Sequence, residues 1–169
     1  MIRNEQNKQL YVRLANEILT GKNLSIADEL FAADFTENAG GEKRVVGIEG
    51  FKVARRRRNL AFPDWRVVIE DMVAEDGKVV VRATGHGTHR GEFIGLAPTG
   101  RNVRVSWIAS YRVADGKFAE HWQNIDDLGL LKQLGASVSL PTLPLSGIRF
   151  LHNRPRLHQQ RRLTSAYGC

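Results

Sequence analysis

Thiol chemistry is almost absent from this chain, because its only cysteine is Cys169, the last of 169 residues. A disulfide within the chain is therefore excluded, and so are zinc or iron–sulfur sites built on several thiolates. No stretch approaches the roughly 18 consecutive apolar residues of a membrane-spanning helix, and the first residues lack the apolar run of a signal peptide. We therefore expect a cytoplasmic protein that does not contact a membrane.

Acidic residues are missing from residues 136–169, which contain five arginines and three of the five prolines. Residues 1–135 contain 20 basic and 18 acidic side chains, so most of the net charge of +7 belongs to the C-terminal stretch. We therefore expect one folded domain over 1–135, and we do not expect nucleic acid as its partner. Residues 136–169 are either a disordered or loosely attached extension or a basic arm that touches a partner.

Several motifs of nucleotide and hydrolytic chemistry are missing as well. The glycine-rich stretches GGEKRVVGIEG and GHGTHRGEFIG lack the order of a phosphate-binding loop, and no dinucleotide fingerprint follows a strand. A nucleophilic serine elbow is not found either. What remains is a chain with 42% hydrophobic and 25% charged residues, which is typical of a globular domain.

The hydrophobic periodicity predicts helices first and then a sheet. Apolar residues recur every three to four positions over 4–20 and over 48–61, which indicates amphipathic helices. Later stretches alternate with a period of two, which indicates strands. This order predicts an α+β fold in which a curved antiparallel sheet wraps over the helices and leaves a cavity between them. The strands before the last one are expected at 35–38, 44–46, 65–74, 78–88 and 103–113.

Residues 116–135, GKFAEHWQNIDDLGLLKQLG, predict the last strand and a closing helix. The strand follows an Asp-Gly hairpin turn, and regular alternation would place Phe118, Trp122, Asn124 and Asp126 on one face. This face begins aromatic and ends in an amide and a carboxylate, so we expect it to line the cavity. The apolar stripe of the closing helix is expected to consist of Leu128, Leu131 and Leu134.

The ordered motifs FPD, GTH-x-GEF, PTG and HW-x-x-x-D-x-LGLL resemble those of the SnoaL-like polyketide cyclases, a family of the NTF2-like superfamily. The resemblance covers about residues 5–135. It implies a cone-shaped α+β barrel and a homodimer formed across the outer face of the sheet. It also implies a reaction without a cofactor on a small hydrophobic or aromatic carbonyl compound.

Asp126 is the first candidate for the chemistry. It occupies the position of the aspartate in the HW-x-x-x-D pattern, and the resemblance implies that this aspartate is the general acid/base. Burial at the end of an apolar pocket would raise the pKa of such a carboxyl and make it a better base near neutral pH. The alternative is that Asp126 caps the closing helix. The Asp126-Asp127 doublet would allow Asp127 to serve the helix while Asp126 faces the cavity.

Four further residues are predicted to contact the substrate. Asn124 shares the strand face of Asp126, and its amide could hydrogen-bond a carbonyl, while Trp122 could supply an apolar wall. Asn38 matches a family position on the short first strand, although it could equally be a turn residue before Gly40-Gly41. The resemblance implies that some relatives have amide or imidazole groups where Ser110 and Arg112 stand, which makes Ser110 another candidate.

The histidines offer one more candidate. His89 belongs to the GTH-x-GEF motif, so it either contacts the ligand in the pocket or holds the nearby loop through a hydrogen bond. His86 lies three positions earlier and would face the other side of a regular strand. The spacing of these two residues does not indicate a metal site. His121 would lie on the face opposite Asp126, where packing or a dimer contact is expected.

Residues 55–58 form a run of four arginines on the predicted helix 48–61. Consecutive helical residues point in different directions, so these side chains cannot form one clamp. We expect a solvated face with extended side chains, or steering of anions toward the mouth of the cavity. Trp107 and Tyr111 are expected in the core or in an interface.

The leading hypothesis, which the resemblance implies, is a cofactor-independent polyketide cyclase. It would close a ring in an aromatic polyketide ester or a similar carbonyl compound by intramolecular aldol condensation, with Asp126 as general acid/base. A second hypothesis is a non-catalytic module on the same fold that binds a small molecule or a protein. A third is another proton-transfer or hydrolytic enzyme, such as an isomerase or an epoxide hydrolase. A basic-tail nucleic-acid binder ranks fourth, and it would require strongly salt-dependent binding that is lost with the tail.

Overall fold

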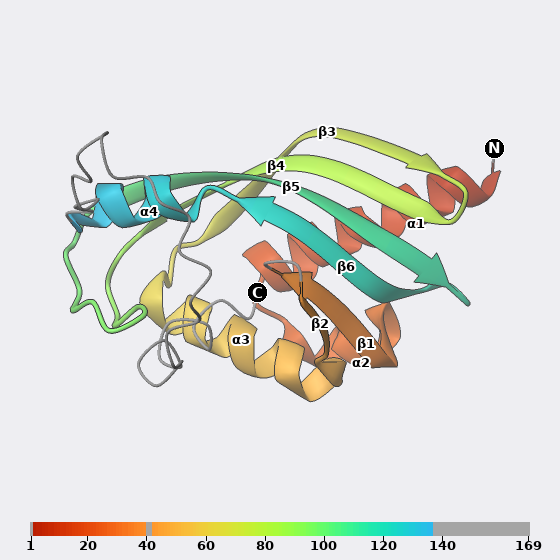
Figure 1. Cartoon of the computed structure of the whole chain (residues 1–169), viewed down its shortest axis with the longest axis horizontal. Coiled ribbons are helices and arrows are strands. Elements are labelled where there is room, and N and C mark those ends of the chain that lie inside the picture. The colour runs from red at the N-terminus through yellow and green to blue at the C-terminus, as the bar shows by residue number, and fades with distance from the viewer. Residues whose placement is uncertain (1, 40–41, 137–169) are drawn as a thin grey trace, which may run out of the picture.

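The computed structural model describes residues 2–39 and 42–136. Within them the chain forms helices, then a first hairpin, a long helix, four long strands and a closing helix (Figure 1). The C-terminal extension expected at residues 136–169 lies outside the described residues, except for Ala136. The helices and helical turns are α1 (Ile2–Arg13), the π-helix η1 (Leu14–Thr20), the 3₁₀ turn η2 (Leu24–Ile26), α2 (Ala27–Leu30), α3 (Gly47–Ala61) and α4 (Asp127–Leu134). The strands are β1 (Phe31–Ala39), β2 (Glu42–Val45), β3 (Arg66–Glu75), β4 (Lys78–Thr88), β5 (Asn102–Ala114) and β6 (Lys117–Ile125).

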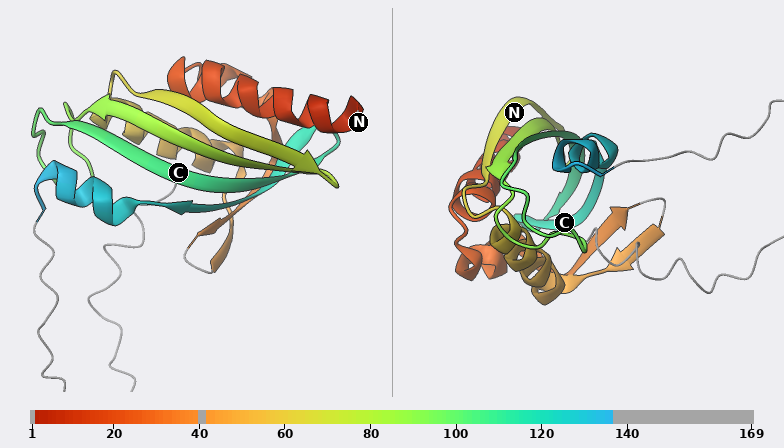
Figure 2. Two further views of the ribbon diagram at one scale, coloured as in Figure 1. Left: turned by 90° about the horizontal axis from the view of Figure 1, so that it is seen from above. Right: turned by 90° about the vertical axis from the view of Figure 1, so that its left-hand side faces the viewer.

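All six strands belong to one curved sheet with the order β2-β1-β6-β5-β4-β3. The predicted antiparallel meander is present in β3 to β6, whereas β1 joins the edge of β6 in parallel and makes the sheet mixed. Seen end-on in the right-hand view of Figure 2, the long strands curl into an open arc that does not close. The predicted α+β fold with a curved sheet around the N-terminal helices is thus confirmed.

The Asp-Gly turns make the two hairpins of the meander. Asp76 and Gly77 both have positive φ angles, 47° and 72°, and Asp115 and Gly116 have 49° and 74°. Two successive positive φ angles define the turn whose twist matches that of the flanking strands. The turns therefore fix the register that brings β4, β5 and β6 together.

The core lies between the concave face of the sheet and the helices. α1 and α3 run along that face in Figure 1, and the buried side chains of α1, η1 and α3 meet those of β1 and the meander. Phe31, Phe51 and Phe118 are almost fully buried, with the Phe31 ring centroid 4.2 Å from Phe51 and 5.5 Å from Phe118. Aromatic pairs at these separations stabilise a core beyond their buried area.

The closing helix begins and ends where the sequence predicts, but it buries a different stripe. Leu130 and Leu134 are buried one turn apart, whereas Leu128 is exposed. Gly135 ends α4 in the left-handed conformation with a φ of 96°. The expected stripe of Leu128, Leu131 and Leu134 is therefore confirmed for Leu134 and wrong for Leu128, because the helix buries the pair Leu130 and Leu134.

No helix in the described ranges is both long enough and apolar enough to span a bilayer.

Candidate functional site

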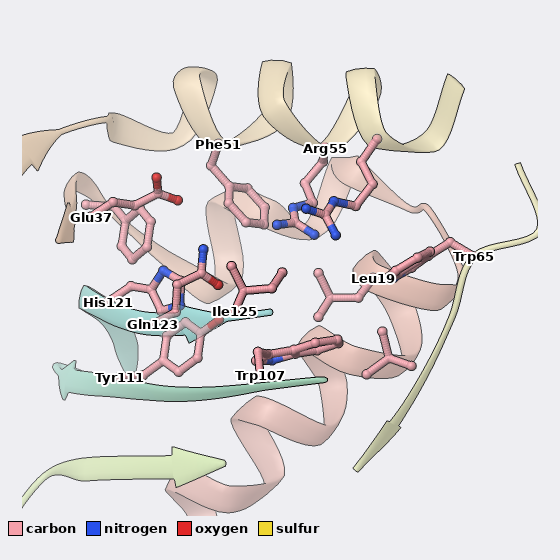
Figure 3. Close-up of a pocket in the computed structure, with 13 residues that line it drawn as sticks. Leu19, Glu37, Phe51, Arg55, Trp65, Trp107, Tyr111, His121, Gln123 and Ile125 are labelled. Atoms are coloured by element: carbon pink, nitrogen blue, oxygen red, sulfur yellow. The ribbon is translucent and has the colours of Figure 1, made fainter. Parts of the chain in front are cut away.

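A narrow cavity lies between α3 and the concave face of the sheet, and its lining combines aromatic rings with a few polar groups (Figure 3). Its free volume is about 30 Å³, which holds a water molecule but no ring compound unless side chains move. Its polar lining consists of Glu37, Arg55, Arg58, His121 and Gln123, and its apolar lining of Leu19, Phe35, Phe51, Trp65, Val67, Trp107, Tyr111 and Ile125.

A β-bulge in β6 decides which residues of that strand reach the cavity. Val113 pairs with Phe118 but Arg112 pairs with Glu120, so Ala119 is an extra residue without a partner on β5. One extra residue moves every later side chain to the other face of the sheet. Phe118 thus faces inward together with His121, and Gln123 and Ile125 follow on the cavity side. The expected cavity face of Trp122, Asn124 and Asp126 is wrong for this reason.

Glu37 on β1 places a carboxyl group on the cavity wall. The side chain is only 6% exposed and alternates with buried Phe35, so both point under α3. Burial raises the pKa of Glu37 to about 7, against the attraction of Arg55 and Arg44, which acts in the opposite direction. A carboxyl with a pKa near 7 can take up and release a proton at neutral pH.

Arg55 enters the cavity from α3. It is only 9% exposed, and its guanidinium carbon lies 5.5 Å from the centre of the Phe51 ring. Figure 3 shows the guanidinium and the Glu37 carboxylate both pointing into the space beneath the helix. Within the described ranges no ion pair joins these two groups, and Arg55 Nε has no hydrogen-bond partner.

His121 forms part of the cavity floor as a neutral ring. Its ring stacks on Tyr111 at 4.4 Å between centroids, and it pairs across the sheet with Glu37. Burial, together with the nearby positive charge of Arg55, lowers the pKa of His121 to about 3. The ring therefore carries no charge at neutral pH, and its buried Nε2 has no hydrogen-bond partner in the described part of the chain.

Of the two adjacent aspartates, Asp126 is the one that caps the closing helix, as the alternative interpretation predicted. Asp126 caps α4, since its Oδ1 accepts a hydrogen bond of 2.8 Å from the backbone N–H of Gly129. Asp127 is half-buried, and burial raises its pKa against the attraction of Arg58, while repulsion from Asp126 adds to the rise. Asp126 is exposed and does not line the cavity. A catalytic role for Asp126 therefore stays a prediction that the family resemblance supports.

The other four predicted substrate contacts on the sheet lie together, but on its outer face. Trp122 pairs with Ser110 on β5 and with Asn38 on β1, and it is 37% exposed. Asn124 follows on the same outer face and is exposed, while Asn38 donates a hydrogen bond to the His121 carbonyl at 3.3 Å. The structure does not bring these residues to the cavity. Their substrate contacts remain predictions from the sequence.

His89 anchors a loop. It is fully buried, and its Nδ1 accepts a 3.2 Å hydrogen bond from the backbone N–H of Thr99. Burial lowers the pKa of His89 and so favours the neutral ring. Because Nδ1 accepts the hydrogen bond, the ring carries its proton on Nε2. This geometry matches the loop-holding alternative, because His89 is not among the residues that line the cavity, and His86 is exposed. No group of three or more potential ligands for a metal ion is found in 2–39 and 42–136.

Glu37, Arg55 and Gln123 are the cavity residues that sequence reasoning missed. Glu37 could have been found, because it lies two positions after Phe35 on a strand with a period of two. Arg55 lies four positions after Phe51, so both share one face of α3. Gln123 could not have been found, because the bulge that turns it inward leaves no clear signal in the sequence.

Comparisons with known proteins agree with this architecture. The model of the SnoaL-like polyketide cyclase family matches residues 9–134. Among solved structures, AclR from Streptomyces galilaeus, a candidate hydroxylase, is 27% identical with a TM-score of 0.72, and it covers 82% of this chain and 90% of its own. TsrD from Streptomyces laurentii is 30% identical with a TM-score of 0.71, over 79% of this chain and 97% of its own.

IdmH from Streptomyces antibioticus, a candidate polyketide cyclase, is 30% identical with a TM-score of 0.67. The match covers 78% of this chain and 99% of IdmH. The search of curated proteins found no match. The similar proteins thus share this fold over nearly their whole length, while their assigned activities differ.

Proposed function

The chain belongs to the SnoaL-like polyketide cyclase family, and we propose that it is an enzyme that closes a ring in a small carbonyl compound by proton transfer. The observation that carries the proposal is Glu37, a carboxyl with a pKa of about 7 buried in an aromatic cavity. The substrate class we propose is an aromatic polyketide or a similar flat carbonyl compound. Such a ring would lie against Phe51, Trp65 and Trp107.

The proposed reaction is an intramolecular aldol condensation. The Glu37 carboxylate removes a proton from a carbon next to a carbonyl, and the resulting enolate carbon attacks a second carbonyl of the same molecule. The new carbon–carbon bond leaves an alkoxide, which takes the proton back from the Glu37 carboxylic acid. The Gln123 amide lines the cavity from β6, the strand next to that of Glu37, and can donate a hydrogen bond to the enolate oxygen.

A buried cavity contributes to this reaction in two ways. It holds the two carbonyls of one molecule close together, which replaces a chance encounter by a fixed geometry. It also excludes water, which strengthens every electrostatic contact inside. Since the free volume is only about 30 Å³, substrate entry requires side chains such as Leu19 or Gln123 to move aside.

Asp126 is the second candidate for the same proton transfer, because it holds the position of the acid/base in the family pattern. The two candidates differ in place: Glu37 lies inside the cavity, whereas Asp126 lies at the exposed start of α4. A base needs to come within hydrogen-bond reach of the proton it removes. Asp126 would meet that condition only if its cap on Gly129 were released.

The test is ring closure of an anthraquinone-type polyketide ester by the wild type, Glu37→Gln and Asp126→Asn, with thermal melting of all three. We expect Glu37→Gln to lose about 100-fold or more of the activity while remaining folded, and Asp126→Asn to keep most of it. Activity lost in Asp126→Asn and kept in Glu37→Gln would return the role to Asp126. A wild type without turnover would favour a binding module, and a different product would favour an isomerase or a hydrolase.

We also propose that the chain forms a homodimer through the outer face of the sheet, in the cytoplasm. Several large apolar side chains are exposed on this face, including Val68, Val73, Val80, Ile108 and Trp122. Exposed apolar patches of this kind mark interaction surfaces. Sedimentation of the wild type and of Ile108→Lys would test the proposal, since a charge in the interface should shift the protein to monomer.

A further inference from the structure

Two guanidinium groups line the same cavity. Arg55 and Arg58 are three positions apart on α3, so they lie on neighbouring points of one helix face. Arg56 and Arg57, which lie between them, are exposed. The run of four arginines therefore divides by orientation, with Arg56 and Arg57 exposed and Arg55 and Arg58 lining the cavity.

Arg55 is the more deeply buried of the two cavity arginines. It is only 9% exposed, and no hydrogen-bond acceptor in the described chain meets its Nε. Burying a charged donor without an acceptor costs free energy, which a bound ligand can recover by supplying the acceptor. The Phe51 ring beneath the guanidinium, at 5.5 Å, holds the group but does not replace an anion.

Among the described lining residues, Arg55 faces one acidic group, Glu37, and no ion pair joins the two within the described ranges. His121 contributes no charge, because burial keeps its ring neutral. The half-buried Asp127 attracts Arg58 from the start of α4, so the surroundings of the two arginines differ. An anionic group on the ligand would supply the acceptor that Arg55 Nε lacks.

We propose that the ligand of this cavity carries a carboxylate, which Arg55 and Arg58 bind, beside a flat ring system that lies against the aromatic walls. The planar fork of N–H donors on a guanidinium group matches the two oxygens of a carboxylate. The proposal deepens the proposed function and rests on it for the reaction, since it names the substrate class of the same site. It differs from the neutral ester that the resemblance favours.

The test compares three ligands that share one ring system: 2-naphthoate, its methyl ester and 2-naphthylmethanol. Each is titrated calorimetrically into the full-length wild type at pH 8, with Trp65 and Trp107 fluorescence as a second signal from the cavity walls. We expect 2-naphthoate to bind about tenfold or more tightly than either neutral compound, because only it meets the guanidinium groups with a charge. Equal binding of acid and ester, or no binding of the acid, would overturn the proposal.

Variants of the cavity arginines test whether the preference for 2-naphthoate over the neutral compounds arises in the cavity. Arg55→Met keeps the length of the side chain and should remove the preference for the acid, while Arg55→Lys should keep part of it. Arg56→Met is the matched control, since it removes the same charge from the exposed side of α3 and should leave the preference intact. If Arg55→Met does not fold, Arg58→Met takes its place. A preference that survives in both cavity variants would contradict the proposal.

Glu37→Gln separates this proposal from the reaction. Removing the acid that repels a carboxylate should strengthen 2-naphthoate binding at pH 8, even though turnover is lost. A wild type that prefers the acid but shows no turnover would refute the reaction and leave the carboxylate site standing. Turnover of a neutral ester without any preference for the acid would refute the site and leave the reaction standing.

Discussion

Glu37 and Glu120 lie on adjacent strands, one register step apart, and they show how differently the two faces of this sheet treat the same side chain. On the outer face, Glu120 lies 3.2 Å from Lys43 Nζ and 3.3 Å from Arg112, and the hydrogen bond from Arg112 lowers its pKa. On the inner face, burial raises the pKa of Glu37 to about 7. The outer carboxylate is thus paired, whereas no ion pair is found for Glu37 within the described residues.

The two carboxyl groups are therefore suited to different roles. A paired surface carboxylate is ionised at every physiological pH, so it cannot readily exchange a proton with a substrate. A buried carboxyl without an ion pair costs stability, but it can exchange a proton and accept a ligand group. The inner face should therefore dominate both large mutational effects and activity, and the following predictions test that division from the largest effect to the smallest.

The largest difference should separate two aromatic residues of β6. Phe118 is fully buried, with its ring 4.6 Å from that of Tyr111, whereas Trp122 is 37% exposed on the outer face. Phe118→Ala should lower the free energy of unfolding by about 3 to 5 kcal/mol, and Trp122→Ala by only about 1 kcal/mol in dilute protein. Urea unfolding of both variants measures this difference. A Trp122→Ala cost that grows with protein concentration would support the proposed homodimer through the outer face, because it would place that ring in the subunit interface.

The second effect is a pH dependence that Glu37→Gln should abolish. The pKa of Glu37 is about 7 in the folded protein and about 4.3 in an unfolded chain, so the folded state binds the extra proton between these values. Glu37 therefore makes the free energy of unfolding fall as the pH rises from about 4.3 to 7, by at most about 4 kcal/mol. The free energy of unfolding of the wild type minus that of Glu37→Gln should therefore fall by up to this amount over the same pH range.

His121 has the opposite slope in an overlapping window. Its pKa is about 3 when folded and about 6.5 when unfolded, so it makes stability rise with pH between these values. The two slopes oppose each other in the wild type, while Glu37→Gln should become more stable as the pH rises from 5 to 6.5. Urea unfolding at pH 5, 6 and 7.5 measures both proteins, with Glu120→Gln as the control. A difference between wild type and Glu37→Gln that is constant with pH would refute the assignment.

A smaller effect concerns the outer end of β6, where Asp126 caps α4. Asp126→Ala removes the acceptor for the Gly129 N–H and should cost about 1 kcal/mol, while Asp126→Asn should cost less because its amide oxygen still accepts. Thermal melting of the two variants gives the comparison. Equal melting temperatures for wild type and Asp126→Ala would show that the cap contributes nothing, which would strengthen the catalytic interpretation of Asp126.

The smallest effect should come from the ion pairs of Glu120. Glu120→Gln breaks its contacts with Lys43 and Arg112, but exposed pairs contribute little after screening and side-chain ordering. We expect a change below about 1 kcal/mol at neutral pH and unchanged ring-closing activity. A loss of activity in Glu120→Gln would break the division between the two faces.

Most of the fold could be predicted because it depends on local patterns. Alternation gave the strands of the meander, the Asp-Gly pairs gave both hairpins, and α3 ends before Pro63 as expected. The parallel contact of β1 with β6 was not predicted, because strand pairing at a distance leaves no periodic signal. The topology of that edge depends on tertiary contacts, which a single sequence does not display.

The cavity-lining residues of β6 were harder to predict, because one extra residue in that strand determines which side chains face the cavity. Regular alternation from Phe118 places Trp122 and Asn124 in the cavity, but the bulge at Ala119 exchanges the two faces. The register does bring Trp122 together with Ser110 and Asn38, but on the outer face of the sheet. Glu37 and Arg55 needed only the reference residues Phe35 and Phe51, whose burial the periodicity indicates.

The narrow cavity has a kinetic consequence. A free volume of about 30 Å³ admits no bicyclic ring, so the lining side chains must separate before a ligand can enter. Binding would then follow a slow opening step, and the observed association rate would level off at high ligand concentration instead of rising in proportion. The rate of ligand binding would then be limited by how often the cavity opens, and not by how often a ligand collides with the protein.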